Sequence, residues 1–401
     1  MKPATRKFIE LDERYGAHNY HPLPVVLERG KGVYVWDVEG RRYFDMLSSY
    51  SALNQGHCHP KIAAAAKKQL GKLTLTSRAF HNTLMGPFLK KLCELAKQDM
   101  ALPMNSGAEA VETAIKAMRQ WGYLKKGIPA DRAEIIVCRG NFHGRTTTIV
   151  GFSSDADSSA NFGPATPGFV PVNYGSLEAL EAAISPNTCG FLVEPIQGEA
   201  GVLVPPTGYL SAARTLCARR NVLFCADEIQ TGLGRTGRMF AVDHEAVRPD
   251  LLILGKALSG GFYPISAVVG SSEVLGLFRP GTHGSTFGGN PLACAIGLAA
   301  LEVLVRERLP ANAAKMGERF RAGVAALRSP LVTDIRGKGL LTGVELRVPA
   351  RPVCERLLEA GLLAKDSHER TIRFAPPLTI TRAQLDAALA IIKAVLSRPL
   401  P

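Results

Sequence analysis

The chain has 401 residues, of which 46% are hydrophobic and 21% are charged. This is enough apolar material for two packed domains or one large one, and the lack of low-complexity bias or a short repeat disfavours disordered, coiled-coil and solenoid architectures. The 48 lysines and arginines outnumber the 35 acidic residues by 13, but they are spread in ones and twos without an aromatic-interleaved stripe, so no nucleic-acid surface is indicated.

Three features of the sequence bear on where the protein works. No apolar run approaches the ~18 residues that a membrane helix needs, and the basic start, residues 1–10, has no apolar core behind it. The eight cysteines form no C-x-x-C pair, and several lie inside apolar runs, as reduced core residues do. We therefore expect a soluble cytoplasmic protein without a membrane partner.

The first predicted elements are two β-rich runs, residues 32–37 and 42–47, which form a hairpin. Between about residues 60 and 300, helical patterns alternate with short apolar runs. The expected helices are 61–70, 84–97, 108–120 and 207–220, and the expected strands are 134–138, 189–194, 222–227 and 251–254. Because such strands are apolar on both faces and are joined by helical crossovers, this region predicts an α/β layer with a parallel sheet.

A second region follows Pro291, where an Ala/Leu-rich helix pattern leads into strands at 332–336 and 340–346 and a final helix at 382–396. Strands followed by helices indicate a smaller α+β domain. No proline- or serine-rich linker separates the two regions, so we expect them to pack together. The expected division is residues 1–47 as an N-terminal segment of the small domain, 48–295 as the large domain and 296–401 as the rest of the small domain.

Two strand ends carry residues that could take part in catalysis. Lys256 follows the apolar strand 251–254, where partial desolvation lowers the pKa of an amine and makes it a candidate nucleophile. The alternative is a solvated surface lysine. Asp227 ends the strand 222–227, where a carboxylate could hold the ring nitrogen of pyridoxal phosphate protonated. A metal ligand or a helix cap is the alternative for Asp227.

Three further segments could complete such a site. Residues 104–114 form a small-residue turn that opens a helix, which favours an anion or is simply a serine N-cap. Residues 281–291 could offer hydroxyl groups to the same phosphate or form only a turn. Phe142 could stack on a planar ring and Arg145 could pair with a carboxylate, or they could serve the core and a structural salt bridge.

Taken together and in this order, five segments resemble the class III pyridoxal-phosphate aminotransferases. They are residues 105–110, 140–146, 194–201, 226–232 and 255–261. The resemblance covers nearly the whole chain and implies fold type I, an α/β fold in which helices flank a mostly parallel seven-stranded sheet beside a smaller α+β domain. Residues 16–24, 47–60 and 372–378 are most similar to the members of this family that act on the δ-amino group of ornithine.

The resemblance implies roles for the residues that would bind pyridoxal 5'-phosphate. Lys256 would bond to the cofactor and shuttle a proton, and Asp227 would pair with the ring nitrogen. Phe142 would stack on the ring, and Gln230 would lie near its hydroxyl group. Ser106, Gly107 and Ala108 would cradle the phosphate, joined by Ser285 and Thr286 from a neighbouring subunit, which implies a homodimer or a higher homo-oligomer.

Two positions depart from the pattern of the family. His143, which we group with the cofactor-binding residues, stands where animal members carry Trp, and Phe287 stands where many members carry Tyr. Both changes are expected to leave the chemistry intact and to alter the packing of the ring or a phosphate contact.

The resemblance also implies a substrate pocket for L-ornithine, 2-oxoglutarate and glutamate. Tyr20 and Arg145 would bind the α-amino and α-carboxylate groups of ornithine, and Tyr50 would line the same pocket. Glu199 would pair with Arg373 in the first half-reaction and release it in the second, so that Arg373 binds the dicarboxylate. The products would be glutamate 5-semialdehyde, which cyclises to pyrroline-5-carboxylate, and glutamate.

Other interpretations remain open beside this one. Residues 232–237 match G-x-G-x-x-G, as in a nicotinamide-dependent oxidoreductase, but the strand ends five residues earlier and no small-residue helix follows. His57 and His59 could hold a metal, although no third ligand cluster accompanies them, so we expect none. A non-enzymatic basic binding protein is a further alternative. Within the family, acetylornithine, 4-aminobutyrate and lysine aminotransferases are the competing activities, and Tyr20 with Tyr50 favours ornithine.

Overall fold

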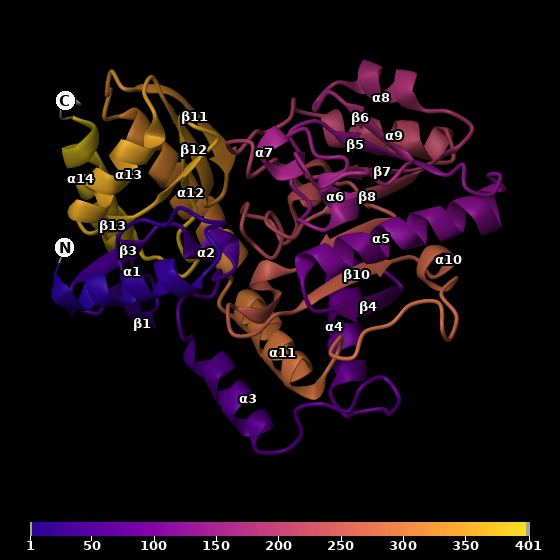
Figure 1. The fold of residues 1–401 in the computed structure, drawn as a ribbon, viewed down its shortest axis with the longest axis horizontal. Coiled ribbons are helices and arrows are strands. Elements are labelled where there is room, and N and C mark those ends of the chain that lie inside the picture. Colours follow the sequence, from indigo (N-terminus) through magenta and orange to yellow (C-terminus); the bar gives the residue numbers. More distant parts are fainter. Residues whose placement is uncertain (1, 398–401) are drawn as a thin grey trace.

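The computed structural model describes residues 2–397, and the chain forms two halves that lie side by side (Figure 1). The half on the right of this view contains a seven-stranded sheet, and the half on the left contains two four-stranded sheets. The first and last helices, α1 (Pro3–Tyr15) and α14 (Arg382–Leu396), both belong to the left half.

The seven-stranded sheet has the strand order β4-β10-β9-β8-β7-β5-β6. Its strands are β4 (Met100–Met104), β5 (Glu134–Cys138), β6 (Phe169–Val172), β7 (Thr188–Val193), β8 (Leu223–Asp227), β9 (Leu251–Leu254) and β10 (Ser266–Gly270). Only β10 runs antiparallel to its neighbours; the other pairings in the sheet are parallel. The predicted α/β class with a mostly parallel seven-stranded sheet is therefore confirmed.

Helices cover both faces of this sheet, which explains why its strands are apolar throughout. In β5, Ile135 and Val137 pack into one apolar cluster with α5, whereas Ile136 and Cys138 pack into a second cluster with α9 and α11. The helices between residues 60 and 306 are α3 (Pro60–Leu70), α4 (Met85–Ala96), α5 (Gly107–Trp121), α6 (Thr147–Val150), α7 (Ala156–Ser159), α8 (Leu177–Ala183), α9 (Tyr209–Arg219), α10 (Ser272–Leu275) and α11 (Pro291–Arg306).

The two smaller sheets bring the N-terminal segment and the C-terminal region together. One has the order β1-β2-β3-β13, and its short last strand pairs in parallel with β3; the other has the order β11-β12-β15-β14. The expected hairpin is confirmed as the antiparallel pair β2–β3. The strands are β1 (Leu27–Lys31), β2 (Tyr34–Asp37), β3 (Arg42–Asp45), β11 (Val332–Lys338), β12 (Leu341–Leu346), β13 (Leu362–Leu363), β14 (Lys365–Ser367) and β15 (Thr371–Phe374), and the remaining helices are α2 (Ser48–Ser51), α12 (Leu309–Ala325) and α13 (Ala350–Glu359).

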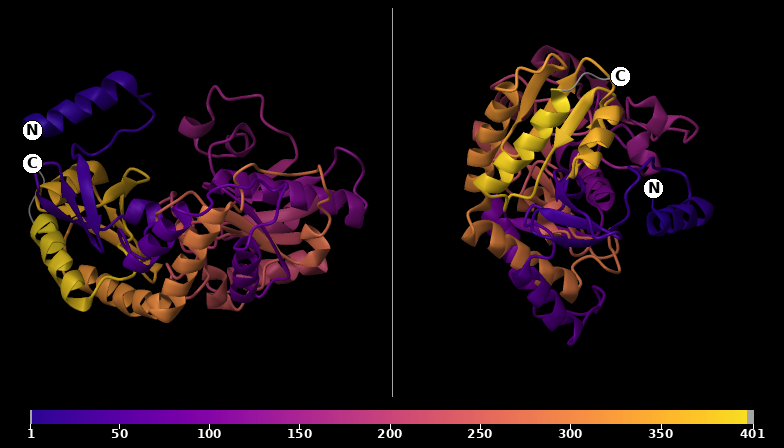
Figure 2. Two further views of the ribbon diagram at one scale, coloured as in Figure 1. Left: turned by 90° about the horizontal axis from the view of Figure 1, so that it is seen from below. Right: turned by 90° about the vertical axis from the view of Figure 1, so that its left-hand side faces the viewer.

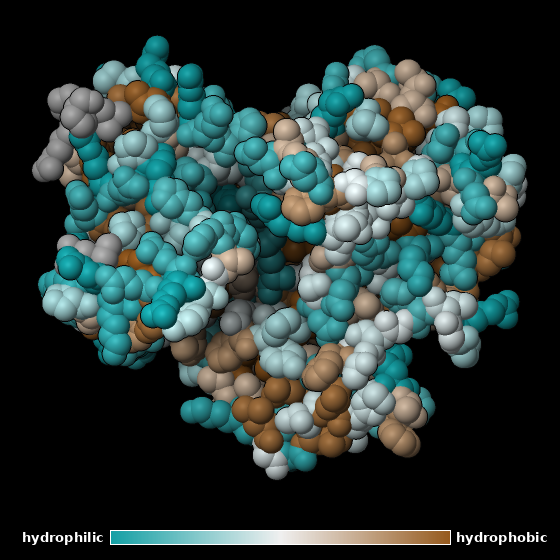
Figure 3. Space-filling model, in the orientation of Figure 1, coloured by the Kyte–Doolittle hydropathy of each residue, from teal (hydrophilic) through white to brown (hydrophobic). Residues whose placement is uncertain are grey.

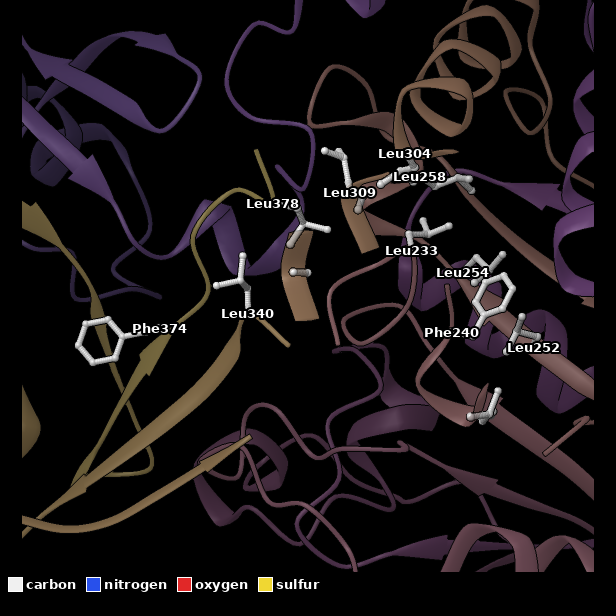
Figure 4. Packing of buried hydrophobic residues seen from close by; sticks show 14 of the residues in the cluster. Leu233, Phe240, Leu252, Leu254, Leu258, Leu304, Leu309, Leu340, Phe374 and Leu378 are labelled. Carbon is white, nitrogen blue, oxygen red and sulfur yellow. The ribbon is translucent and has the colours of Figure 1, made fainter. Parts of the chain in front are cut away.

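One apolar cluster runs through both halves. Leu252 and Leu254 of β9 belong to it, and so do Leu340, Phe374 and Leu378 from the C-terminal region. Figure 4 shows Leu233 and Leu309 between these two groups. A shared core of this kind packs the halves together, as the lack of a linker predicted. At the surface, the molecule is hollowed between the halves, and hydrophilic side chains line the hollow (Figure 3).

Several elements are not anticipated by the sequence patterns, among them β6, α8, β10 and α1. Strand β10 is the antiparallel strand of this mostly parallel sheet, and it inserts between β4 and β9. Helix α1 begins at Pro3 and stands out from the rest of its half (Figure 2), with Phe8, Leu11 and Tyr15 exposed. No helix within residues 2–397 is long and apolar enough to cross a membrane.

Candidate active site

A cavity of about 230 Å³ lies at the carboxyl end of the parallel strands. The segments that follow β4, β5, β7, β8 and β9 all reach it, because parallel strands bring their carboxyl ends to one edge of a sheet. The predicted site residues that line this cavity are Gly107, Ala108, Phe142, His143, Asp227, Gln230 and Lys256. Residues that are far apart in the sequence therefore meet in one place.

Lys256 stands just after β9, half-buried in the wall of the cavity. Its backbone φ is 41°, a left-handed conformation that lysine rarely adopts and that the surrounding packing must hold. Burial lowers the pKa of the ammonium group, and the carboxylates of Glu199 and Asp227 oppose this shift. A lysine with a lowered pKa carries a free electron pair more often, as a nucleophile requires.

Asp227 is the last residue of β8, and its side chain is buried. Its Oδ2 lies 2.7 Å from Nδ1 of His143, and its Oδ1 accepts the backbone N–H of Ile229 at 3.0 Å. Two donors on different oxygens fix the orientation of the carboxylate. A carboxylate held in this orientation in the wall of the cavity can accept a hydrogen bond from a protonated ring nitrogen.

The start of α5 presents backbone amides to the cavity. The Ser106 hydroxyl accepts the N–H of Glu109 at 3.2 Å, and the Glu109 carboxylate accepts the N–H of Ser106 at 2.7 Å and of Asn105 at 3.0 Å. This capping box leaves Gly107 and Ala108 to face the cavity in the first helical turn, where amides and the helix dipole favour an anion. A Cβ on Gly107 would lie 3.1 Å from Cδ1 of Ile229, so glycine keeps this approach open.

Ser285 and Thr286 do not line the cavity of their own chain. The Ser285 hydroxyl accepts the Asn105 side-chain amide at 2.9 Å and the Gly288 N–H at 2.9 Å, and Thr286 is exposed. The loop of these two residues therefore contacts the residue that precedes Ser106. The expectation that they serve a neighbouring subunit stays a prediction.

Glu199 and Arg373 form an ion pair beside the cavity. Nη1 of Arg373 lies 2.6 Å from Oε1 of Glu199, which also accepts the side-chain amide of Gln230 at 3.0 Å. Burial alone would raise the pKa of Glu199, but the charge and hydrogen bond of Arg373 hold it below its ordinary value. The Arg373 guanidinium lies over the ring of Tyr50, with its Cζ 5.1 Å from the ring centroid.

None of the five predicted substrate residues belongs to the lining of the cavity, and two of them are exposed. The side chain of Arg145 is exposed, and its Cζ lies 5.7 Å from the centroid of the Phe142 ring. Tyr20 is 67% exposed and lines a separate groove beside α1. The structure therefore groups Glu199, Arg373 and Tyr50 but leaves Arg145 and Tyr20 at the periphery.

One buried acid in the wall was not singled out from the sequence. Glu194 follows β7, lines the cavity and accepts the Phe142 N–H at 3.0 Å. Burial raises the pKa of its carboxyl group to about 8, so this acid is mostly protonated at neutral pH. Its place at the end of an apolar strand matches that of Asp227, and this signal could have identified it.

The segments behind the competing interpretations have structural partners instead. His57 pairs with Asp45 at 2.7 Å, whereas His59 lies 3.3 Å from Glu307. Within residues 2–397, no group of three or more His, Cys, Asp or Glu side chains could hold a metal ion. Residues 232–237 form a turn, and a short 3-10 helix at Ala241–Glu245 follows them.

The cavity residues fit pyridoxal 5'-phosphate. The amine of Lys256, with its lowered pKa, can react with the aldehyde carbon. The Asp227 carboxylate, which is held by two hydrogen bonds, can pair with the ring nitrogen. The open helix start at Gly107 suits the phosphate. Phe142 belongs to the same wall, where a ring can stack on it.

Comparison with known proteins identifies the family. The model of the class-III aminotransferases matches residues 15–396. An ornithine aminotransferase from Exiguobacterium is 57% identical over 393 residues, 98% of each chain. The structure of an ornithine aminotransferase from Toxoplasma gondii, with partial occupancy of PLP at its active site, superposes with a TM-score of 0.97 at 47% identity, covering 98% of this chain and 94% of that one.

The chain is also similar to a solved structure of an aminotransferase with a different named substrate. An acetylornithine aminotransferase from Elizabethkingia anophelis has a TM-score of 0.90 at 50% identity and covers 98% of both chains. The predicted resemblance is confirmed at the level of the family, its fold type and its cofactor. The chain belongs to the class III aminotransferases and is a pyridoxal-phosphate-dependent enzyme of that family.

Proposed function

We propose that the protein transfers the δ-amino group of L-ornithine to 2-oxoglutarate. The products are L-glutamate 5-semialdehyde, which cyclises to pyrroline-5-carboxylate, and L-glutamate. The observation that carries this proposal is the Glu199–Arg373 ion pair at 2.6 Å beside the lysine-bearing cavity. The names of the curated relatives that are 56–57% identical also support ornithine as the substrate.

The proposed roles in holding the cofactor follow from the contacts in the cavity. When bound, pyridoxal phosphate supplies an aldehyde that accepts an amino group and a ring that takes up negative charge from the substrate carbon. Nζ of Lys256 holds the aldehyde carbon and later moves a proton, and Asp227 keeps the ring nitrogen protonated. Phe142 stacks on the ring, Gln230 lies near its hydroxyl group, and Ser106, Gly107 and Ala108 bind the phosphate.

The Glu199–Arg373 pair lets one pocket accept two differently charged substrates. With the pair closed, the charge of Arg373 is neutralised, and the pocket admits an amine end. With Glu199 moved away, the guanidinium is free to bind a carboxylate of 2-oxoglutarate or glutamate in a bidentate manner. Tyr20 and Arg145, both exposed in the isolated chain, bind the α-amino and α-carboxylate groups of ornithine in this proposal.

We propose the same organisation of the chain as the sequence predicted. Residues 48–295 form the large domain, and residues 1–47 and 296–401 form the small domain, of which residue 1 and residues 398–401 lie outside the described part of the chain. The working unit is a homodimer or a higher homo-oligomer, because the exposed Thr286 and its neighbour Ser285 serve the phosphate of a partner subunit. The eight cysteines, none of which forms a disulfide, support a cytoplasmic location.

An assay with alternative amino donors tests the substrate. The purified enzyme is incubated with 2-oxoglutarate and either ornithine, acetylornithine or 4-aminobutyrate, and pyrroline-5-carboxylate and glutamate are measured. We expect the highest kcat/KM with ornithine. A higher kcat/KM with acetylornithine would refute the ornithine assignment and leave the family unchanged. Lys256→Ala serves as the control that must abolish turnover with every donor.

A further inference from the structure

The loop of residues 281–288 carries Ser285 and Thr286, and it follows helix α10, which packs against α5 (Figure 1). At Gly281 and Gly284 a Cβ would meet no atom within 4 Å, so the loop has open space on both sides of His283. Glycines in open space give a loop many accessible conformations. Contacts with α5 therefore decide where Ser285 and Thr286 stand.

His283 bridges two positions of α5. Its Nε2 lies 2.9 Å from the hydroxyl oxygen of Thr113, and its Nδ1 lies 3.0 Å from the ammonium nitrogen of Lys116. The Thr113 hydroxyl donates its single proton to the carbonyl oxygen of Glu109 at 2.7 Å, so toward the imidazole it can only accept. Nε2 therefore carries the proton, and Nδ1 accepts one from Lys116. The same ammonium group donates to the carbonyl oxygen of Thr282 at 2.9 Å.

This bridge requires a neutral imidazole. Burial and the charge of Lys116 lower the pKa of His283 below its ordinary value, although the charge of Glu109 opposes the shift. The ring is thus neutral at neutral pH, and Nδ1 keeps the lone pair that accepts from Lys116. The ring also packs against Phe278, at 5.3 Å between centroids. One donor, one acceptor and an aromatic neighbour hold the imidazole in place.

Ser285 makes a second contact between the loop and the region of α5. Its Oγ accepts the side-chain amide of Asn105 at 2.9 Å and the N–H of Gly288 at 2.9 Å. These contacts occupy the lone pairs of the oxygen and leave its proton for a further acceptor. Thr286, the next residue, is exposed. Asn105 stands just before Gly107, which lines the cavity, so the same helix start adjoins the cavity and the outward-facing loop.

We propose that His283 is a positioning residue that fastens the loop of residues 281–288 to α5 and thereby places Ser285 and Thr286 for the cofactor phosphate of the partner subunit. Helix α5 thus serves both sites of a dimer, one through its start and the other through this loop. The inference rests on the proposed function of Ser285 and Thr286 at the partner's site.

The position of the bridge along α5 makes a specific effect on the phosphate measurable. Thr113 and Lys116 lie about 9 and 14 Å along the helix from Gly107, so neither side chain belongs to the helix start at the cavity of the same chain. The cofactor-free form of each variant is titrated with pyridoxal 5'-phosphate and with pyridoxal, which lacks the phosphate. The ratio of the two dissociation constants measures what the phosphate contributes, and thermal unfolding of the cofactor-free form checks the fold.

Three substitutions alter the bridge, and a fourth is the control. His283→Phe keeps a ring of similar size without a donor or an acceptor, whereas His283→Gln keeps an amide nitrogen near the place of Nε2 that can donate to Thr113. Lys116→Met removes an ammonium group on the exposed side of α5, so it tests the bridge even where His283→Phe fails to fold. Gln120→Leu is the control, because Gln120 also donates from α5, to the carbonyl oxygen of Leu277 at 3.1 Å, ahead of the loop.

We expect His283→Phe and Lys116→Met to bind pyridoxal 5'-phosphate about tenfold more weakly and pyridoxal within about twofold of the wild type, because hydrogen bonds that place the loop are lost. His283→Gln should remain within about threefold for both ligands, and Gln120→Leu should match the wild type. An unchanged ratio of the two dissociation constants in His283→Phe or in Lys116→Met would overturn the proposal. An equal change of this ratio in Gln120→Leu would overturn it too.

Ser285→Ala and Thr286→Val tell apart the failure of the two assignments. If neither variant changes the ratio, the loop does not bind the phosphate, and the role of His283 falls with it. If they change the ratio but His283→Phe and Lys116→Met do not, only the role of His283 is refuted. None of these measurements depends on which amino donor the enzyme prefers, so they stand apart from the ornithine assay.

Discussion

The ion pair of Glu199 with Arg373 makes a first prediction at the scale of single residues. Glu199→Ala removes the carboxylate that neutralises the buried guanidinium, so Arg373 is free to bind a dicarboxylate in both half-reactions. We expect the ratio of the glutamate rate to the ornithine rate to rise about tenfold or more, the usual effect of one charge-assisted hydrogen bond. Rapid-mixing measurements of each half-reaction by cofactor absorbance give this ratio.

Glu181→Ala is the matched control for this experiment. Glu181 also pairs with an arginine, Arg220 at 2.9 Å, but both side chains are exposed on the surface. Loss of such a pair has little effect in water. A rate ratio that is the same in Glu199→Ala, Glu181→Ala and the wild type would refute the switch.

Glu228 makes a prediction about pH. Its buried carboxyl group accepts the Thr231 hydroxyl and the Val242 N–H, and burial raises its pKa from 4.5 to about 7. In the unfolded chain the group ionises near its ordinary pKa. Between these two pKa values the unfolded state binds fewer protons than the folded state, so the free energy of unfolding falls as pH rises, by about 3 kcal/mol in total.

Glu228→Gln cannot ionise and keeps an acceptor for the amide of Val242. The stability of this variant relative to the wild type should therefore increase from pH 5 to pH 8, as measured by chemical denaturation at both values. Glu10→Gln on the exposed face of α1 should show no such trend. A stability difference between Glu228→Gln and the wild type that is independent of pH would contradict the prediction.

The residues of the site differ in how far their sequence neighbourhood predicts them. Asp227 ends one apolar strand and Lys256 closely follows another, and parallel pairing brings such strand ends to one edge of the sheet. The contact between His143 and Asp227 joins a loop to the end of a strand that is distant in the sequence, and no local pattern encodes that contact. Glu194 carries the same strand-end signal as Asp227, and the shift in its pKa becomes apparent only when the burial around it is known.

At the scale of secondary-structure elements, the start of α5 links helix stability to phosphate binding. Glu109→Ala removes the carboxylate that accepts two backbone amides ahead of the helix. We expect a loss of about 1 kcal/mol in stability, typical of a lost cap, and weaker cofactor binding because Gly107 and Ala108 are held less rigidly. Thermal unfolding of the cofactor-free protein and titration with the cofactor measure the two effects.

Glu109→Gln distinguishes the cap from the charge. Glutamine serves at this position of a capping box, so this variant should retain most of the stability and of the cofactor affinity. If Glu109→Ala and Glu109→Gln lower the stability and the cofactor affinity equally, the capping hydrogen bonds do not account for the effect of Glu109.

Some helices and strands could be predicted from sequence patterns and others could not. Helix α5 was predicted to within a residue or so because an apolar face, a serine cap and a glutamate three residues later coincide. Strand β10 was missed: Ser266–Gly270 has only three apolar residues, between a serine and a glycine, and its antiparallel direction depends on the long-range pairing with β4 and β9. Helix α1 is amphipathic and was nevertheless overlooked; only Thr5 of its residues is buried, so the helix adds little to the core.

At the scale of the whole molecule, the exposed Thr286 makes a prediction about assembly. If its hydroxyl serves the phosphate of a partner subunit, Thr286→Glu inactivates the partner's site, whereas Lys256→Ala inactivates its own. Each variant alone should be nearly inactive. A dimer that contains one chain of each kind has one site with both residues intact, so refolding an equal mixture should restore about a quarter of the wild-type activity. If Thr286 acted within its own chain, the mixture would stay inactive.

Arg235 ties the two halves of the molecule together. Its wholly buried guanidinium donates from Nη1 to the carbonyl oxygens of Leu340 at 2.9 Å and Pro376 at 2.6 Å, and from Nη2 to the side chain of Asn54 at 2.6 Å. Burial lowers the pKa of this group to about 9. The segment that bears Arg235 follows β8, whereas two of its acceptors belong to the C-terminal region that also carries Arg373.

Arg235→Lys should therefore destabilise the enzyme and impair its site. A lysine has a single ammonium group that cannot reach acceptors on three segments, and unpaired buried acceptors lower the free energy of unfolding by about 3 kcal/mol or more. Arg238→Lys, at an exposed position three residues away, should lie within about 0.5 kcal/mol of the wild type. Because the bonds of Arg235 fix the C-terminal region relative to Lys256, kcat should fall in Arg235→Lys even where the protein is fully folded. Equal stability and equal kcat in the two lysine variants would show that the shared apolar core alone fixes the position of the two halves relative to each other.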